Sequence, residues 1–542
     1  MIYKLLVTAF LAFNLITHLG LAEETPADFE TLLAQLTTKK FNEKEIIIGE
    51  IASSGHEQAL PVLTRLLEGE VYYRKDDKKI VFVDIVEKDA LVTDIISGED
   101  LGTLPKKKVK KVGINNKLRG VLKGAIARLS LNNQDPEVRR AAVVEMFENL
   151  DNDTILLIEE RLPKEEDDDV IEVLNTALAI SNLKSQDRTT VLAAVETLSK
   201  SLHPEARTAL TSLKTNLSEQ PSTPQSQEIT SAIDNSLHYI NSSVGWYKQI
   251  ENVFFGVSLG SVLLLAAVGL AITFGVMGVI NMAHGEMLML GAYTTYIIQQ
   301  VFPSLLQYSL LISIPVAFVF TAIVGIAIER GVIRFMYGRP LETLLATFGI
   351  SLILQQAVRT LISPQNRAVA TPDFMSGSLE INPALSLTYN RLYIIIFAFL
   401  VLAGLMLLLK KTNFGLQIRA VTQNRTMAKA MGIRTDWVDA LTFGLGSGIA
   451  GMAGVALSQL TNVGPNLGQG YIIDSFMVVV FGGVGNLWGT LFGAMTLGIA
   501  NKFLEPFTGA VVAKILILVL IILFIQKRPR GMFALKGRSA ES

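Results

Sequence analysis

The chain is 542 residues long, carries a formal net charge of −1 at pH 7 and contains no cysteine. This length predicts at least two domains, and the balanced charge provides no basic surplus for binding a nucleic-acid backbone. The absence of cysteine excludes disulfides and thiolate metal ligands, and the five histidines include no i, i+4 pair on one helix face. We therefore expect no metal site, no cofactor and no nucleic-acid partner.

Residues 1–22 have the pattern of a secretory signal peptide. Lys4 supplies the positive charge, Leu5 to Ile16 form the apolar stretch, and Gly20-Leu21-Ala22 have the pattern of a cleavage site. An uncleaved membrane anchor is the alternative interpretation, because only one lysine marks the charged region. Both interpretations predict that the residues that follow are exported.

Residues 23–217 are expected to form an exported, soluble and mostly helical domain. Three similar helix openings, at Asp135, Asp168 and His203, recur every 33 to 35 residues, a period expected of stacked helix pairs. The pattern predicts a HEAT-like repeat domain, with an ordinary helical domain as the alternative, and such repeats usually bind rather than catalyse. The first helix is marked by apolar residues at helical spacing, namely Phe29, Leu32, Leu33 and Leu36.

Part of this domain departs from the helical pattern. Val71–Arg74 and Lys79–Val83 are β-prone runs on either side of a polar turn, which predicts a small β-hairpin. The basic run Lys106–Lys111 lacks interleaved aromatic residues and is interpreted as a solvated loop. Residues 218–252 are assigned to a linker and pre-membrane segment, because Ser218–Gln227 is polar, contains proline and shows no apolar period.

Residues 253–526 are predicted to form a polytopic helical membrane domain, so the fold class is all-α apart from the small hairpin. A glycine-rich pair of segments between Ile472 and Phe503 is broken at Gly482–Asn486, and the pattern leaves open whether this pair spans twice or forms a re-entrant hairpin. The other apolar segments approach the ~20 residues that a spanning helix requires, and they cover about 253–275, 287–301, 310–328, 341–362, 392–409, 438–460 and 510–525.

Basic residues near the spans set the orientation, because lysine and arginine remain on the cytoplasmic side. With an exported N-terminal domain, the counted crossings place three basic clusters inside and the loop from Ser363 to Asn390 outside. The last cluster belongs to a cytoplasmic tail, residues 527–542. The clusters are Arg330, Arg334 and Arg339; Lys410, Lys411, Arg419, Arg425, Lys429 and Arg434; and Lys527, Arg528, Arg530, Lys536 and Arg538.

The sequence contains no G-x-x-x-x-G-K-[ST] phosphate-binding loop. We therefore expect that the chain is not an enzyme and that ATP-driven work would require a partner. A G-x-G-x-x-G is present at Gly446, Gly448 and Gly451, but it lies inside an apolar span with no strand before it. Close helix packing in lipid explains these glycines better than dinucleotide binding.

Polar residues inside the apolar half are candidates for a solute pathway, because ionisable groups at membrane depth are costly unless they face a cavity or a partner. Amides and hydroxyls would suit a small neutral polar solute. The alternative for His284 and Glu286 is that they cap a helix end or pair with each other at the membrane interface. The three clusters are Asn281, His284 and Glu286; Asp474 and Ser475; and Gln355, Gln356 and Arg359.

The predicted cytoplasmic loop from Lys410 to Trp437 contains a short stretch, Asn424–Met431, that is able to form a helix ended by Gly432. A compact helix in such a loop could dock on a motor subunit. An ordinary solvated loop is the alternative.

Several motifs resemble a known family. The runs G-V-S-L-G-S from Gly256 and N-M-A-H-G-E-M-L-M-L-G-A-Y ending at Tyr293, and T-N-F-G-L-Q-I-R-A-V-T-Q-N-R-T-M-A-K-A-M-G-I-R from Thr412, resemble the permease subunits of branched-chain amino-acid-type ABC importers. Within that family, L-A-T-F-G-I-S-L-I-L-Q-Q from Leu345, P-N-L-G-Q-G-Y-I-I-D-S-F from Pro465 and I-Q-K-R-P-R-G-M-F-A-L-K-G-R resemble the urea-specific branch.

The resemblance implies an alternating-access importer that carries urea across the bacterial inner membrane. Its partners would be a second permease subunit, two ATP-binding subunits and a periplasmic urea-binding protein. The candidate pathway positions are Asn281, His284, Glu286, Gln355, Asp474 and Ser475. The implied ATPase-coupling segment consists of Asn424, Arg425, Thr426, Ala428, Lys429, Met431 and Gly432.

Two other functions remain open. A permease of the same family could carry branched-chain amino acids or short-chain amides. A membrane receptor could bind a ligand with its periplasmic domain, but no kinase, cyclase or methyl-accepting region follows the last span. The exported domain could dock a binding protein, which its position alone suggests.

Overall fold

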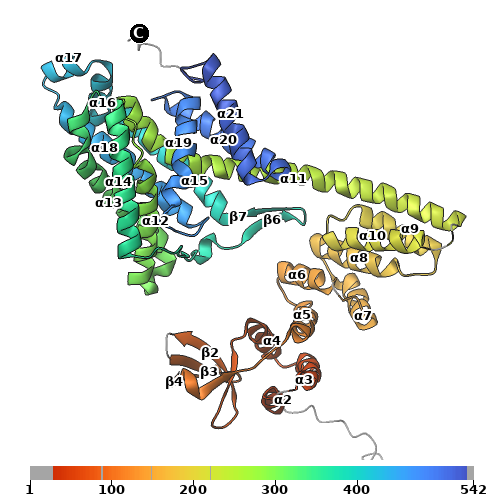
Figure 1. The fold of residues 1–542 in the computed structure, drawn as a ribbon. Helices are drawn as coiled ribbons and strands as arrows, with labels where there is room; N and C mark the ends of the chain where they lie inside the picture. The colour runs from red at the N-terminus through yellow and green to blue at the C-terminus, as the bar shows by residue number, and fades with distance from the viewer. Residues whose placement is uncertain are drawn as a thin grey trace, which may run out of the picture. The chain divides into compact units, whose positions relative to one another are not determined.

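The computed structural model describes residues 29–533, apart from residues 39, 87–88, 148, 220 and 222. The predicted signal peptide and residues 534–542 of the basic tail lie outside the described residues. The chain forms two compact units, which divide between Ser243 and Val244, and helices dominate both (Figure 1). The expected fold class, helical with a polytopic membrane domain, is confirmed.

Asparagine and aspartate side chains begin five helices of the first unit. Asn115, Asp135, Asp151, Asp167 and Asp187 each accept a hydrogen bond from a backbone N–H in the first turn that follows, which satisfies a donor that has no partner inside the helix. The helices of this unit are α2 (Phe29–Gln35), α3 (Phe41–Ser53), α4 (Ala59–Glu68), α5 (Asn116–Ser130), α6 (Pro136–Met146), α7 (Asn152–Arg161), α8 (Asp168–Asn182), α9 (Arg188–Ser199) and α10 (Pro204–Ser218), with a 3₁₀ turn at Leu162–Lys164.

The three predicted helix openings are confirmed, because α6, α8 and α10 begin there. His203 does not cap α10, however. Its side chain is buried, and its ring packs edge-on against Phe147. Stacked HEAT-like repeats remain a prediction. The apolar stripe expected at the start of the domain is confirmed, since one core contains Phe29, Leu32, Leu33 and Leu36.

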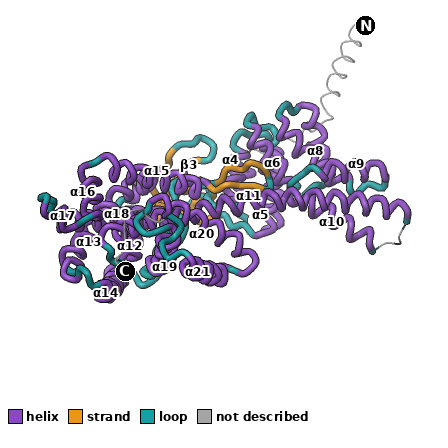
Figure 2. The backbone as a smooth tube through the Cα atoms, turned by 90° about the horizontal axis from the view of Figure 1, so that it is seen from above, coloured by secondary structure: helices purple, strands orange, loops and turns teal. Residues whose placement is uncertain are grey.

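The predicted hairpin is part of a larger sheet. β1 (Val71–Arg74) and β2 (Ile80–Val86) pair antiparallel, as expected, within a sheet of order β4-β3-β2-β1-β5. Figure 2 draws the strands in orange and labels β3. β3 (Asp89–Asp94) and β4 (Asp100–Pro105) were not predicted. The solvated-loop interpretation of Lys106–Lys111 is wrong, because Lys106–Lys108 form a 3₁₀ turn and Val109–Lys111 form the edge strand β5. The lysine side chains are exposed, as an edge strand in water requires.

The segment assigned to a linker is helical over most of its length. α11 (Pro224–Met277) runs without a break from the first unit into the second. Its first part belongs to the first unit, where Ile233 and Ile240 are buried and Ser236 lies against α9. The linker assignment is corrected for residues 224–252. Hydropathy could not detect this helix because its first half is mostly polar.

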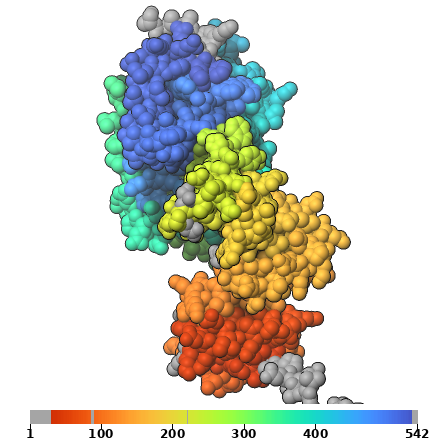
Figure 3. All heavy atoms as spheres, turned by 90° about the vertical axis from the view of Figure 1, so that its right-hand side faces the viewer, coloured from red at the N-terminus to blue at the C-terminus, as the bar shows by residue number. Residues whose placement is uncertain are grey.

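In the second unit, α18 lies at the centre. In the most apolar stretch of α18, 83% of the residues are buried. In the corresponding stretches of α13, α14, α15 and α21, 17–28% of the residues are buried. Figure 3 shows the outer surface of α20 and α21 in blue. The elements are α12 (His284–Val301), α13 (Ser309–Gly331), α14 (Pro340–Leu361), α15 (Tyr389–Lys411), α16 (Asn413–Gln423), α17 (Arg425–Ala430), α18 (Thr435–Ser458), α19 (Leu467–Gly482), α20 (Leu487–Thr508) and α21 (Ala510–Lys527), with 3₁₀ turns at Pro303–Tyr308, Ile333–Met336 and Asp373–Met375 and a hairpin of β6 (Ser378–Asn382) and β7 (Leu385–Thr388).

Within residues 29–533, six helical segments are long and apolar enough to cross a membrane, and they contain α11, α13, α14, α15, α18 and α21. The glycines of α18 serve packing, as expected. A Cβ added at Gly446 would lie 2.7 Å from the carbonyl oxygen of Gly269 in α11, and Gly454 packs directly on the backbone of α12. The small residues therefore let the central helix approach two neighbours closely.

Contacts between loops divide the helix ends into two sets. At the first end, the last turn of α11 packs near both α17 and the turn between α19 and α20. The described parts of all three basic clusters begin in the last turns of α13, α15 and α21, which finish at this end. At the second end, Arg367 bridges to Val463, Gln299 bonds Ala370, and Asn390 bonds Gln459. The hairpin β6–β7, in the loop with weaker charge, belongs to the second end.

The predicted break at Gly482–Asn486 is confirmed, because α19 ends at Gly482 and α20 begins at Leu487 with Asn486 as its N-cap. The chain after α21 packs on this turn. Met532 N–H donates to the carbonyl of Phe481 at 2.9 Å, and the ring of Phe533 stacks on Phe492. The start of the basic tail is therefore held in place through Phe533.

Arg139 and Glu165 form a buried ion pair in the first unit. The Glu165 side chain is 1% exposed and accepts hydrogen bonds from Arg139 at 2.6 and 2.8 Å and from Arg161 at 2.9 Å. Hydrogen bonding to Arg139 lowers the pKa of Glu165 to about 2. The ion pair joins α6 to the segment before α8.

We predict that Glu165→Gln lowers the free energy of unfolding of the first unit by about 3 kcal/mol at pH 7, because Arg139 would remain buried without its partner. A carboxyl whose folded pKa is lowered stabilises the fold above its unfolded pKa, roughly 4.3, and this contribution is lost as the pH falls toward about 2. Pulse proteolysis of the full chain in detergent, with thermolysin at pH 7 and pepsin at pH 3, should therefore show a smaller difference at pH 3. The exposed neighbour Glu166 provides the control, Glu166→Gln, and equal stability of the two variants at pH 7 would contradict the prediction.

Candidate functional site

α14 buries a polar face. Thr343, Thr347, Ser351 and Gln355 are all buried, and their four-residue spacing places them on one side of the helix. We call these four residues the α14 polar stripe. The exposed side of α14 is apolar, which suits contact with hydrocarbon, while the polar groups face protein. Its most exposed large apolar side chains, 68–83% exposed, are Leu341, Leu345, Ile353 and Leu361.

Glu286 of α12 contacts this stripe. Its Oε1 atom accepts hydrogen bonds from Ser351 Oγ at 2.9 Å and from Gln355 Nε2 at 2.7 Å. The residue is 1% exposed, and within the described part of the chain its second oxygen, Oε2, is buried without a hydrogen-bond partner. An unpartnered buried acceptor costs free energy. Glu286 Oε2 is therefore a free acceptor at the centre of a cluster of hydroxyl and amide groups.

Asn281 and His284 hold the start of α12. Asn281 Oδ1 accepts a hydrogen bond from Ala283 N–H at 3.0 Å, and the fully buried His284 ring donates from Nε2 to the carbonyl of Ala266 at 2.9 Å. His284 and Glu286 do lie in the first turn of α12, as the alternative interpretation expected, but their contacts run to different helices and not to each other. Of these three residues, Glu286 is hydrogen-bonded to the polar stripe.

α19 crosses α12 at the turn that carries Glu286. A Cβ added at Gly285 would lie 2.6 Å from the carbonyl oxygen of Gly468 and 3.2 Å from Ile472. The absence of a side chain at Gly285 is therefore what allows the two backbones to touch. This contact fixes the position of Glu286 relative to α19.

Asp474 and Ser475 belong to a different place. Asp474 Oδ2 accepts a hydrogen bond from Lys514 Nζ of α21 at 2.8 Å, with the Asp474 side chain 12% exposed and that of Lys514 49% exposed. Ser475 Oγ donates to the carbonyl of Tyr471 in its own helix. The contacts found for these two residues thus lead to α21 and along α19, and not to Glu286.

The third predicted cluster divides in the same way. Gln355 joins Glu286, whereas Gln356 is exposed and bonds Thr360 on its own helix. Arg359 Nη2 donates to Asn466 Oδ1 at 2.7 Å at the second end. Thr347 and Ser351 were missed, and the signal that could have found them is the four-residue recurrence of polar residues in an otherwise apolar span.

The predicted helix in the basic loop is confirmed as α17. Asn424 Oδ1 accepts a hydrogen bond from Met427 N–H at 2.9 Å, and the helix stops before Gly432, whose φ of +87° suits glycine. Met427 and Met431 are 59% and 77% exposed. Asn424, Thr426 and Lys429 are also exposed, but Ala428 is buried and Arg425 forms an ion pair with Asp439. Two of the seven expected coupling residues thus contact the rest of the unit.

The second unit is similar to proteins of a known family. Residues 252–525, just over half of the chain, match the family model described as branched-chain amino acid transport system / permease component. The chain is 29% identical over 295 residues to the high-affinity branched-chain amino acid transport system permease protein BraD of Pseudomonas aeruginosa, covering 53% of this chain and 96% of that protein.

The high-affinity branched-chain amino acid transport system permease protein LivH of Escherichia coli K12 is also 29% identical, over 293 residues that cover 52% of this chain and 94% of that protein. A probable branched-chain amino acid transport permease protein LivH of Methanocaldococcus jannaschii is 28% identical over 291 residues, with coverage of 50% and 88%. No solved structure matches the chain.

The close crossing of α12 and α19 yields a test of the site's construction. Gly285→Ala should destabilise the second unit by about 2 kcal/mol, because the methyl group would overlap the Gly468 carbonyl in a packed core. The midpoint of thermal aggregation, measured by size-exclusion chromatography in detergent, should fall. Gly404→Ala in α15 and Gly349→Ala in α14 are matched controls, since no atom lies within 4 Å of the added carbon. Loss of stability in all three variants alike would contradict the close contact.

Proposed function

This chain belongs to the family of permease components of branched-chain amino acid transport systems, and we propose that the solute it carries is urea. As a family member it is a multi-pass inner-membrane permease component of an ABC transport system, and it is not itself an enzyme. Relatives in this family imply ATPase and binding-protein partners. The identity of the solute, the partners and the orientation are our proposals.

The observation that supports urea is the free oxygen of Glu286 among neutral groups. Urea is uncharged, carries N–H donors on both nitrogens and has one carbonyl acceptor, so it can donate to Glu286 Oε2 while Gln355 or Ser351 reorients toward its carbonyl. An amino acid would also bring a carboxylate. The two side chains that bond Glu286 are neutral, and Arg359, the basic residue one turn beyond Gln355, is already bonded to Asn466. The motifs that resemble the urea-specific branch support the same solute.

A branched-chain amino acid is the second candidate. Both BraD and LivH are named as branched-chain amino acid permeases, and each is 29% identical to this chain. The Glu286 carboxylate could then bind the ammonium group of the solute. Short-chain amides share the N–H donors of urea and would use the same acceptor.

Uptake by intact cells distinguishes these solutes. In a strain lacking this gene, complementation should restore uptake of labelled urea and leave uptake of labelled leucine unchanged. Glu286→Gln should reduce urea uptake about tenfold or more, because an amide nitrogen replaces an acceptor for the solute's N–H groups. Glu342→Gln, an exposed carboxylate at the start of α14, is the control. Leucine uptake that depends on the gene, with urea uptake unaffected, would overturn the urea proposal in favour of the amino acid.

We propose that the first end of the second unit faces the cytoplasm, because the described basic clusters lie there. The first unit would then lie in the periplasm, where a urea-binding protein could dock, and α19 and α20 would each span the membrane. A second permease subunit and two ATP-binding subunits complete the proposed transporter. α17 is the proposed contact with an ATP-binding subunit, through Met427 and Met431, which stand one turn apart and are exposed.

Replacing both methionines with aspartate should abolish docking. The double variant Met427→Asp, Met431→Asp places two charges in an apolar contact, so the amount of ATP-binding subunit that co-purifies should fall about tenfold or more. Membrane insertion, measured by the yield of full-length chain in the membrane fraction, should not change. Leu379→Asp, at an exposed apolar residue of β6 on the second end, is the control. A normal amount of ATP-binding subunit co-purifying with the double variant would contradict the proposed docking.

A further inference from the structure

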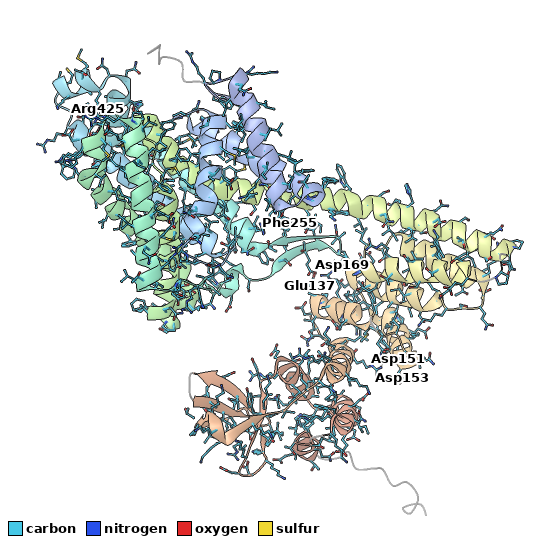
Figure 4. The ribbon with its side chains drawn as sticks, in the orientation of Figure 1. Glu137, Asp151, Asp153, Asp169, Phe255 and Arg425 are labelled. Atoms are coloured by element: carbon cyan, nitrogen blue, oxygen red, sulfur yellow. The ribbon has the colours of Figure 1, made fainter. Side chains whose placement is uncertain are left out.

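Arg425, labelled in Figure 4, is the first residue of α17, and its guanidinium contacts two other elements. It forms an ion pair with Asp439 of α18, and its Cζ atom lies 4.3 Å from the centre of the Tyr337 ring. The Asp439 side chain is 1% exposed. A planar guanidinium that is both hydrogen-bonded to a buried carboxylate and stacked on an aromatic ring has little freedom to reorient.

Tyr337 links this guanidinium to the polar stripe. It occupies the short connection between the 3₁₀ turn Ile333–Met336 and the start of α14 at Pro340. The first residue of the stripe, Thr343, is bonded to the same connection, because its Oγ1 donates to the carbonyls of Arg339 at 2.9 Å and Met336 at 3.2 Å. Tyr337 therefore lies in the segment that Thr343 ties to the first turn of α14.

Asp439 links the guanidinium to the other side of the site. It lies in the second turn of α18, and α18 packs closely along α12, with Gly454 against the backbone of Leu288. Leu288 is two residues beyond Glu286, which bonds the stripe through Ser351. One side chain of α17 thus contacts elements that lead to both helices of the Glu286 site.

We propose that Arg425 is a positioning residue that couples movement of α17 to the Glu286 site, through Tyr337 to α14 and through Asp439 to α18 and α12. The inference rests on the proposed docking of α17 on an ATP-binding subunit. The Arg425 guanidinium is bonded to Asp439 inside the unit, and the exposed side chains of Met427 and Met431 form the proposed docking contact. The role of Arg425 is to carry displacement of the docked helix to the two helices that hold the solute.

The test measures the number of urea molecules moved per ATP hydrolysed. The assembled transporter is purified through a tag on this chain and reconstituted in proteoliposomes. Tyr337→Leu removes the ring and keeps the ion pair, whereas Tyr337→Phe keeps the ring. Arg425→Lys keeps the charge but removes the planar stack. For Tyr337→Leu and Arg425→Lys we expect ATP-binding subunits in normal amounts, ATP hydrolysis within about twofold of the unmodified transporter, and roughly fivefold or greater loss of urea moved per ATP. Tyr337→Phe and Arg434→Gln, an exposed arginine of the same loop, should behave as the unmodified chain.

The double variant Arg425→Lys, Tyr337→Leu should lose no more coupling than either single variant, because both changes break the same link. Additive losses would overturn the proposal, as would an unchanged urea-to-ATP ratio in both single variants, or failure of Tyr337→Phe to retain coupling. Failure of the proposed function gives different results. If ATP-binding subunits remain bound when Met427 and Met431 are replaced, docking through α17 is wrong; if the unmodified transporter moves leucine and no urea, the solute is wrong, and the same ratios measured with leucine test the link.

Discussion

Hydrocarbon offers no hydrogen bonds, so every polar side chain of the membrane half has to find a partner within the protein or face a path for solute. α14 shows how the chain meets this constraint. Its most exposed apolar side chains face outward, its buried hydroxyls and the amide of Gln355 face inward, and Ser351 and Gln355 meet Glu286 there. Glu286 is one of several residues in the described part of the chain at which the constraint is left unmet, because one oxygen of its carboxylate keeps no hydrogen-bond partner. A solute with N–H groups would give this oxygen a hydrogen-bond donor only while the solute moves through the protein.

Local sequence patterns predicted most helices of the membrane half. The composition of the site depends on which side chains from different helices meet, and local patterns do not show this. The spans were predictable because their apolar runs approach the length of a bilayer crossing, and α17 was predictable because Asn424 and Gly432 mark its two ends. Lys514 was not recognised as the partner of Asp474, since a single lysine in an apolar run gives no sign of which helix it will meet. Ser351 was missed for the same reason, although its spacing from Gln355 carried the information.

The first unit was harder to predict because its elements are short and its surfaces are polar. Asp135 before Pro136 identified the start of α6 correctly, since capping is a local interaction. The sheet depends on pairing between strands far apart in the chain. β5 comes from a lysine-rich run, which forms a strand because it pairs with β1. The first half of α11 was not predicted because it has no apolar run. Its contacts are with α9 of the first unit, through Ser236 and through the ion pair between Glu228 and Arg188.

The α14 polar stripe is wound as a screw thread. Four residues advance an α-helix by about 6 Å and turn it by about 400°, so each member of the stripe stands about 40° further around the axis than the one before it. From Thr343 to Gln355 the thread therefore rises by about 18 Å while it winds through about 120°. To present Thr347 to Glu286 in place of Ser351, α14 would have to turn by about 40° and slide by about 6 Å along its own axis. Such a screw motion keeps the helix beside its neighbours, whereas a helix that swings aside needs free space next to it.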